Sequence, residues 1–182
     1  MRPLIFTQNV TADGSIEMLD DWFDPMAQDA DQAQIVARDS ASCDAILLGR
    51  QTFEDFRGFW PHQTDDATGI TDYLNTVDKY VVSSTMTDPE WQNSTVLSGD
   101  VIDEVTALKN ADGKDIVVTG SISLCHTLIG AGLVDEYRLF VYPTVQGSGR
   151  RLFPDGLEIP TLRLVDTKSF ELGVSLLRYR TV

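Results

Sequence analysis

The sequence has little of what disulfide-rich, metal-binding or membrane proteins require. Only two cysteines occur among the 182 residues, Cys43 and Cys125, and no CxxC spacing joins them. This excludes a disulfide framework or a cysteine zinc site as an organising feature. No run approaches the roughly 20 apolar residues that span a bilayer. Arg2 and the short strand-like run after it do not make a signal peptide, so the sequence predicts a cytoplasmic protein with no membrane segment.

Positive charge is also scarce. Lys and Arg together number 14 against 28 Asp and Glu, which gives a formal net charge of −14. Nucleic-acid binding depends on clustered basic residues that displace counterions from phosphates, so this class of partner is excluded. A phosphate-bearing ligand would need its own local positive residue, and Arg50 is a candidate. Salt adaptation of the surface and genome composition both remain explanations for the acidity.

The remaining composition is that of a globular protein, with 42% hydrophobic and 23% charged residues, and the length predicts a single domain over residues 1–182. Strands are expected at Leu4 to Gln8, Ala45 to Leu48, Tyr80 to Val82, Ser94 to Leu97, Ile116 to Val118 and Tyr137 to Tyr142. Helical segments are expected at Ala30 to Cys43, after Gly49, after Asp100 and after Gly120. Two alternating runs, Leu162 to Lys168 and Val174 to Tyr179, predict an antiparallel hairpin. The pattern indicates an α/β fold in which helices flank a mostly parallel sheet that ends in this hairpin.

The segment from Ile116 to Pro143 organises the chain. A buried strand ends at Gly120, which frees the backbone for a turn, and Ser121 or Ser123 can cap the following helix. The free N–H groups at such a helix N-terminus favour a phosphate. Strand-glycine-helix turns also occur in α/β proteins that bind nothing there, so a purely structural role is the alternative.

Three predicted strands end in small or hydroxylated residues at one rim of the sheet, where α/β proteins bind ligands. These segments are Gly49 to Thr52, Ser83 to Thr85 and Gly120 to Ile122, and the Asp13-Gly14 loop follows the first strand. Together they predict a nucleotide site. Each also has a structural reading, in which Thr52 caps a helix, Ser83 and Ser84 end a strand, and Arg50 pairs with a surface aspartate.

These motifs resemble the dihydrofolate reductase-like superfamily. The chain is most similar to the branch that contains the C-terminal reductase domain of the bifunctional riboflavin-biosynthesis enzyme. The resemblance covers nearly the whole chain and rests on the Asp13-Gly14 loop, AILLGRQTF from Ala45, VVSST from Val81, VVTGS from Val117, GLVDEYRLFVYP from Gly132 and the GSGRRLF that follows.

The resemblance implies an oxidoreductase that uses NADPH. Gly49, Arg50 and Thr52 would then meet cofactor phosphates, and the pyrophosphate would lie on the turn of Thr119, Gly120, Ser121, Ile122, Ser123 and Leu124. The adenosine side would lie near Ser83, Ser84 and Thr85, and the nicotinamide near Val10, Thr11 and Gly14. A guanidinium can hold a 2′-phosphate through paired hydrogen bonds, so Arg50 predicts NADPH in preference to NADH.

The sequence therefore predicts a reductase that transfers a hydride from NADPH to a small heterocyclic, imine or carbonyl substrate. Asp31, with Asp13 behind it, is the candidate proton donor, although a cap and a turn are their alternative roles. Trp22 and Trp60 are candidate walls of the substrate pocket, with core packing as the alternative. A homodimer is expected, because the hairpin leaves sheet surface uncovered.

Two departures from the family pattern keep a second function open. The riboflavin branch usually carries Glu-Gly-Gly where this chain has Thr119-Gly120-Ser121, which removes a carboxylate that faces the substrate. Dihydrofolate reductases place an acid at the start of the helix before the GR motif, and Asp31 matches that place only approximately. The alternative is a nucleotide-binding sensor of the same fold that has lost catalysis.

Overall fold

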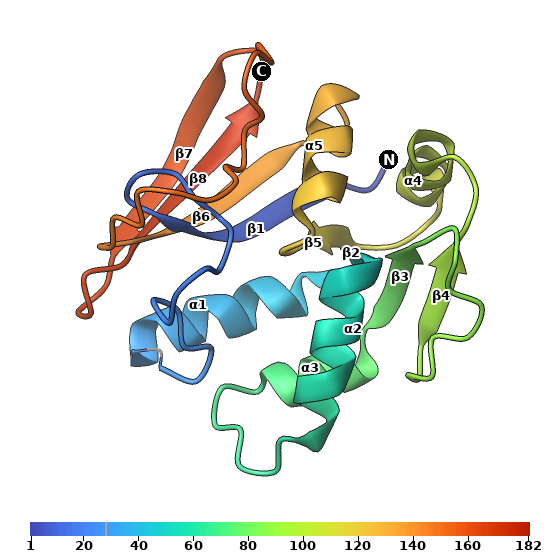
Figure 1. Ribbon diagram of the computed structural model, residues 1–182, viewed down its shortest axis with the longest axis horizontal. Coiled ribbons are helices and arrows are strands. Elements are labelled where there is room, and N and C mark those ends of the chain that lie inside the picture. Colours follow the sequence, from blue (N-terminus) through green and yellow to red (C-terminus); the bar gives the residue numbers. More distant parts are fainter. Residues whose placement is uncertain (28) are drawn as a thin grey trace.

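The computed structural model describes residues 1–27 and 29–182 of the chain, and its strands form one eight-stranded sheet (Figure 1). The spatial order is β4-β3-β2-β5-β1-β6-β8-β7. The first six strands in this order pair in parallel, whereas β8 pairs antiparallel with both β6 and β7. The strand bounds are β1 Leu4–Thr11, β2 Cys43–Gly49, β3 Asp78–Val82, β4 Ser94–Leu97, β5 Asp115–Val118, β6 Glu136–Tyr142, β7 Leu162–Ser169 and β8 Ser175–Thr181.

Helices cover the sheet on both faces, as the ribbon shows (Figure 1). Helices α4 (Val101–Asn110) and α5 (Ile122–Gly130) lie on one face. Helices α1 (Ala30–Ala41), α2 (Arg50–Phe59) and α3 (Ile70–Thr76) lie on the other, together with the 3₁₀ turn η1 (Trp60–His62). The predicted α/β class, with a mostly parallel sheet, flanking helices and a C-terminal antiparallel hairpin, is confirmed.

Strict alternation along β1 decides which side chains reach which face. Leu4, Phe6 and Val10 enter the core on the α5 side, whereas Thr7 and Asn9 point to the opposite face and line a cavity there. Because successive residues of a strand point to opposite faces, the same strand supplies both the core and the site.

The structure departs from the expected elements in three places. Strand β1 runs three residues beyond the expected Gln8, because Asn9 to Thr11 stay in register with Phe140 to Tyr142 of β6. The segment after Gly49, where only the start of a helical turn was expected, is a ten-residue helix. Helix α3 was not expected, because its N-cap is Gly69 at φ 76° and the first-turn N–H of Thr71 bonds instead to the Asp66 side chain.

Helix α4 follows its sequence signal directly. The Asp100 carboxylate accepts the N–H groups of Ile102 and Asp103, which satisfies two first-turn donors. Val105 and Leu108 then face the sheet from the next two turns. In the part of the chain that the structure describes, no helix is long and apolar enough to cross a membrane.

Candidate functional site

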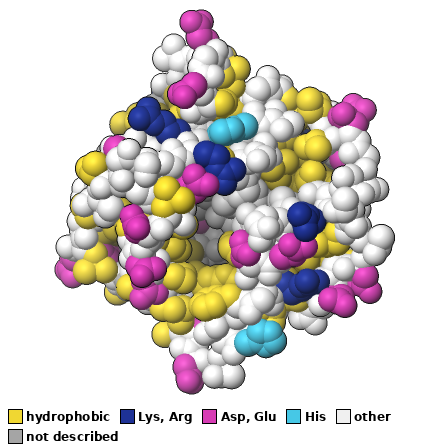
Figure 2. Space-filling view, viewed as in Figure 1, with side chains coloured by type: hydrophobic (Ala, Val, Ile, Leu, Met, Phe, Trp, Pro, Cys, Tyr) yellow, Lys and Arg dark blue, Asp and Glu magenta, His cyan; other side chains and the backbone are white. Residues whose placement is uncertain are grey.

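Two adjoining cavities open along the sheet. The rim cavity, of about 810 Å³, lies where β2, β5 and β1 end, and the inner cavity, of about 420 Å³, extends along the sheet beneath α1. Figure 2 shows the molecule hollowed near the centre of this face, with hydrophobic side chains beside the hollow. The two cavities share the lining residues Asn9, Phe23, Asp55, Phe56 and Thr119, so a molecule in one would touch a molecule in the other.

The N-termini of α2 and α5 meet at the rim cavity and hold each other in place. The N–H of Gly49 donates to Ser121 Oγ at 2.8 Å, and the N–H of Ser121 donates to Thr52 Oγ1 at 2.9 Å. Both hydroxyls therefore join one helix to the other. Among the described residues, neither helix has a side chain that caps it, so first-turn N–H groups remain available to an anion.

Gly120 makes this approach possible. Its φ is +58°, and a Cβ at this position would lie 2.9 Å from Thr52 Cγ2. The side-chain amide of Gln8 holds the turn through two hydrogen bonds. Its Oε1 accepts the Gly120 N–H at 3.1 Å, and its Nε2 donates to the Gly120 carbonyl at 3.0 Å. Gln8 is buried, so these bonds are shielded from water. Two hydrogen bonds from Gln8 therefore hold the turn within the protein itself.

The expected phosphate residues lie in this cavity. Gly49, Arg50 and Thr52 line it, and so does the turn comprising Thr119, Gly120, Ser121, Ile122, Ser123 and Leu124. The Arg50 guanidinium is half exposed and pairs with Glu54 at 3.2 Å, one helical turn away. A second basic residue, Arg150 from the GSGRRLF segment, also lines the cavity and pairs with Glu17 at 2.7 Å.

Other expected cofactor residues lie elsewhere. Ser83, Ser84 and Thr85 are not among the described residues that line either cavity, and Ser83 Oγ accepts the N–H groups of Thr85 and Met86, which ends the strand. Their neighbour Val82 does line the rim cavity.

The residues expected beside the nicotinamide also lie apart from the described lining of both cavities. The Val10 side chain is buried in the core on the α5 side. Thr11 and Gly14 form the turn after β1, where the Thr11 hydroxyl donates to Asp13. Of the β1 residues, Asn9 is the one that faces both cavities.

The two expected proton donors occupy structural positions. Asp31 lies in the first turn of α1, where its exposed carboxylate pairs with Lys168 at 2.7 Å. Asp13 accepts hydrogen bonds from the Thr11 hydroxyl and from the N–H groups of Gln146 and Gly147, which lower its pKa to about 2. Neither is among the described residues that line a cavity, so the chemistry proposed below is not assigned to them.

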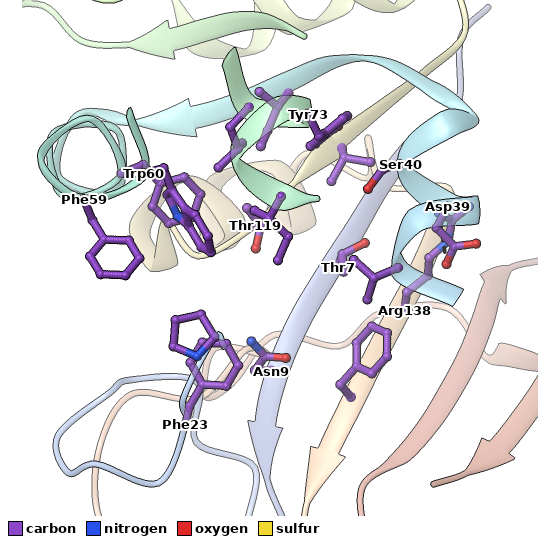
Figure 3. Close-up of a pocket in the computed structure, with 18 of the residues that line it drawn as sticks. Thr7, Asn9, Phe23, Asp39, Ser40, Phe59, Trp60, Tyr73, Thr119 and Arg138 are labelled. Carbon is purple, nitrogen blue, oxygen red and sulfur yellow. Dashed lines mark ion pairs between the residues drawn. The ribbon is translucent and has the colours of Figure 1, made fainter. Parts of the chain in front are cut away.

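Aromatic rings form the outer wall of the inner cavity. Phe23, Phe59 and Trp60 line one side, opposite Thr7, Asn9 and Thr119 of the sheet (Figure 3). The expected wall residue Trp60 is therefore at the cavity. Trp22 is not among the described lining residues, since its ring packs on Tyr142 and its indole N–H donates to Gln146.

Charged residues close the far end of the inner cavity, where Asp39 of α1 and Arg138 of β6 lie (Figure 3). They belong to an arginine–acid cluster at the amino ends of β5 and β6. Arg138 Nε donates to Glu136 at 2.7 Å, and Arg178 pairs with Asp39. The full cluster comprises Asp39, Asp115, Glu136, Arg138, Asp166, Arg178 and Arg180.

The sequence reasoning missed much of the lining, including Gln8, Asn9, Gln32, Asp55 and Arg150. Period-two alternation could have identified Asn9, since it follows Thr7 on the same face. Gln32 stands one position after the expected Asp31, is buried, and reaches the Tyr142 hydroxyl at 3.3 Å. The helical pattern gave no signal for which of these two adjacent side chains turns inward.

Comparison with known proteins agrees with this geometry. The model of the RibD C-terminal domain family matches residues 2–177. The chain belongs to the RibD C-terminal domain family. Bacillus subtilis strain 168 has a relative named uncharacterized protein YyaP, which is 33% identical over 180 residues that make up 98% of this chain and 94% of that protein.

Solved structures show the same fold at low sequence identity. A pyrimidine reductase-like protein from Corynebacterium diphtheriae superposes with a TM-score of 0.72 and 16% identity, covering 100% of this chain and 92% of that one. A diaminohydroxyphosphoribosylaminopyrimidine deaminase/5-amino-6-(5-phosphoribosylamino)uracil reductase from Thermotoga maritima superposes with a TM-score of 0.68 and 15% identity. The superposition covers 100% of this chain and 57% of the Thermotoga maritima protein, so this chain matches only part of that longer protein.

Proposed function

We propose that this protein is an NADPH-dependent reductase that transfers a hydride to a small heterocyclic imine or carbonyl substrate of the riboflavin-pathway or pterin type. The observation that carries the proposal is the pair of helix N-termini at the rim cavity, which Ser121 and Thr52 join and no described side chain caps. Two converging helix ends suit a pyrophosphate, because each supplies N–H donors and a partial positive charge. The names of the reductase-like relatives support the same chemistry.

The residues present fit the cofactor. Gly120 lets the turn lie close against Thr52, where a Cβ would crowd the threonine, and so brings the two helix ends together. Arg50 would hold the 2′-phosphate by exchanging its exposed pairing with Glu54 for charge-assisted bonds. When bound, NADPH supplies the hydride. Asn9, Phe56 and Thr119 border both cavities, so they would orient the substrate against the nicotinamide.

The inner cavity would take the substrate. The rings of Phe23, Phe59 and Trp60 provide flat apolar walls for a heterocycle, and Thr7, Thr119 and Gln32 offer hydrogen bonds at its edges. A cavity of about 420 Å³ is within the range that holds a single small ring system.

The test has two steps on the full chain. Titration with NADPH should quench protein fluorescence and saturate, and NADPH oxidation should then rise above the rate without substrate for at least one member of a panel of pterins, aminopyrimidines and quinones. Saturable binding with no turnover on any member would favour the sensor. No NADPH binding would overturn both functions.

A homodimer is part of this proposal. Strand β7 forms the edge of the sheet and exposes Leu164 and Val165, and a second copy could cover this surface. The dimer should appear as twice the chain mass of 20.2 kDa in light scattering at micromolar concentration. A monomer mass would contradict it.

A further inference from the structure

The inner cavity has a second opening, away from the rim cavity. It continues into a groove of about 560 Å³ that lies between α1 and α3 and reaches the amino ends of β2 and β3. We call this space the α1–α3 groove. The residues that line both it and the inner cavity are Val36, Ser40, Ile70 and Tyr73. Ser40 and Tyr73 lie at this junction, at the end of the inner cavity away from Phe59 (Figure 3). A ligand in the inner cavity can therefore extend into the groove.

Two hydroxyl groups at the junction have no partner within the described part of the chain. Neither Ser40 Oγ nor the Tyr73 hydroxyl makes a hydrogen bond there, and both residues are half-buried. The other hydroxyls that line the groove, those of Thr68 and Thr76, bond to groups of their own segments. Ser40 and Tyr73 can thus each donate to and accept from a group that enters from the inner cavity.

The groove carries negative charge and no described positive charge. Asp44 and Asp78 are among its described lining residues, whereas Lys, Arg and His are not. Asp44 pairs with Arg2, but Asp78 is exposed and has no described Lys, Arg or His nitrogen within 4.0 Å. The basic side chain that lines the inner cavity, Arg138, is already paired with Glu136 at 2.7 Å. A phosphate in the groove would meet no free cation and would be repelled.

We propose that the α1–α3 groove is a subsite for an uncharged, hydroxyl-bearing substituent of the substrate, and that it rejects the phosphorylated form of that substituent. The inference rests on the proposed function only in placing the heterocycle in the inner cavity. A chain of CH–OH groups suits this lining, because Val36 and Ile70 offer apolar contacts to its carbons while Ser40 and Tyr73 exchange hydrogen bonds with its hydroxyls. A terminal phosphate would lose hydration without gaining a cation.

Three probes that share one ring test the inference on the full chain. Uracil is the ring alone, uridine adds a neutral hydroxylated sugar, and uridine 5′-monophosphate adds a phosphate to that sugar. Dissociation constants are measured by ligand-observed NMR without NADPH at one ionic strength. Every titration contains the same excess of inorganic pyrophosphate, so that the phosphate of the probe does not compete for the helix N-termini at the rim. We expect uridine to bind about fivefold more tightly than uracil, and the monophosphate about tenfold more weakly than uridine.

Tyr73→Phe removes one of the two junction hydroxyls and keeps the ring. The preference for uridine over uracil should therefore fall to within about twofold. The matched control is Tyr80→Phe, which removes a hydroxyl from a half-buried tyrosine that packs on the opposite face of the sheet and is not among the described lining residues. This control should keep the fivefold preference.

Ala37→Lys supplies the cation that the groove lacks. Ala37 is exposed on α1 and lines the groove, so the new ammonium group should tighten binding of the monophosphate at least about fivefold and change that of uridine less than about twofold. The control Gln34→Lys adds the same charge at an exposed position of α1 that is not among the described lining residues. Binding of the monophosphate should then tighten by less than about twofold, because solvent and salt screen the charge.

The inference is overturned if uridine binds no more tightly than uracil, or if the monophosphate binds the wild type as tightly as uridine does. A preference for uridine that survives Tyr73→Phe, a monophosphate that gains nothing from Ala37→Lys, or no detectable binding of any probe would each overturn it as well. Failure of the proposed function is read separately. These titrations contain no NADPH, so the preferences can hold where NADPH fails to bind, and NADPH can bind and be oxidised where the preferences are absent.

Discussion

The two polar ends of the adjoining cavities are built on opposite principles. At the carboxyl ends of β2 and β5, the contacts are made by neutral groups, since the N–H groups of Gly49, Gly120 and Ser121 donate to the side chains of Ser121, Gln8 and Thr52 respectively. At the amino ends of β5 and β6, the arginine–acid cluster buries charges and pairs them with one another.

This difference predicts separate roles for the two ends, with the arginine–acid cluster stabilising the fold and the Gly120 turn binding a ligand. Paired buried charges have no remaining attraction for a ligand and cost free energy to disturb. Uncapped helix ends retain donors that only a ligand or water can satisfy. We therefore expect changes in the cluster to appear mainly in stability, and changes in the turn of Gly120 to appear mainly in affinity for the dinucleotide.

The largest expected effect is on stability, from Arg138→Met. This change leaves Glu136 without the guanidinium that donates to it at 2.7 Å in a buried setting, and should lower the free energy of unfolding by about 3 kcal/mol. The control is Arg38→Met, whose exposed guanidinium lies 3.4 Å from Asp39 of the same cluster and should cost less than about 1 kcal/mol. Urea denaturation measures both, and equal losses would show that the buried pairing of Arg138 contributes no more to stability than an exposed ion pair.

Next in size is Gly120→Ala. Gly120 has a left-handed φ of +58°, and the added Cβ would lie only 2.9 Å from Thr52 Cγ2, so the turn should shift. NADPH should then bind at least tenfold more weakly. The free energy of unfolding should fall by about 1 to 3 kcal/mol. Gly58→Ala on α2 is the matched control, because an added Cβ there meets nothing within 4 Å. It should stabilise the protein by about 0.4 to 1 kcal/mol and leave NADPH affinity unchanged. Unchanged NADPH affinity in Gly120→Ala would argue against the phosphate role of the turn.

How much of this arrangement the sequence could predict depends on the kind of signal each residue carries. Gly49, Thr52 and Gly120 stand at or just after the ends of predicted strands. Parallel strands bring their carboxyl ends to one edge, so the gathering of these residues at the rim cavity was predictable. Their roles toward NADPH stay predictions.

Other parts of the site had no local signal. Whether Asp31 or Gln32 turns inward depends on how α1 packs against β6, and the fixing of the Gly120 turn by Gln8 joins residues 112 positions apart. The arginine–acid cluster likewise gathers side chains from α1 and four strands. The parallel sheet sets these contacts, and no short stretch of sequence encodes them.

A smaller effect is expected at Arg50, one of the two arginines that line the rim cavity. Arg50→Ala should weaken NADPH binding by about tenfold and leave NADH nearly unchanged, because only NADPH carries the 2′-phosphate that a guanidinium holds. The half-exposed position of Arg50 and its pairing with Glu54 limit the gain through solvent screening. Fluorescence titration of both dinucleotides at fixed ionic strength gives the two ratios. Equal losses would mean that Arg50 supports the loop instead of the phosphate.

The smallest expected effect is the pH dependence of the stability that Glu136 contributes within the arginine–acid cluster. Burial alone would raise the pKa of Glu136, but hydrogen bonds from Arg138 and Arg180 outweigh it and hold the pKa below its ordinary value of 4.5. A carboxylate with a lowered folded-state pKa contributes stability above its unfolded pKa and loses that contribution as the pH falls through the folded value. The stability advantage of the wild type over Glu136→Gln should therefore be constant from pH 7 to about 5 and shrink below that. The effect is small because a single group changes its protonation. Urea denaturation at stepped pH measures it, and an advantage that stays constant down to pH 3.5 would show that Glu136 acts through packing and not through its charge.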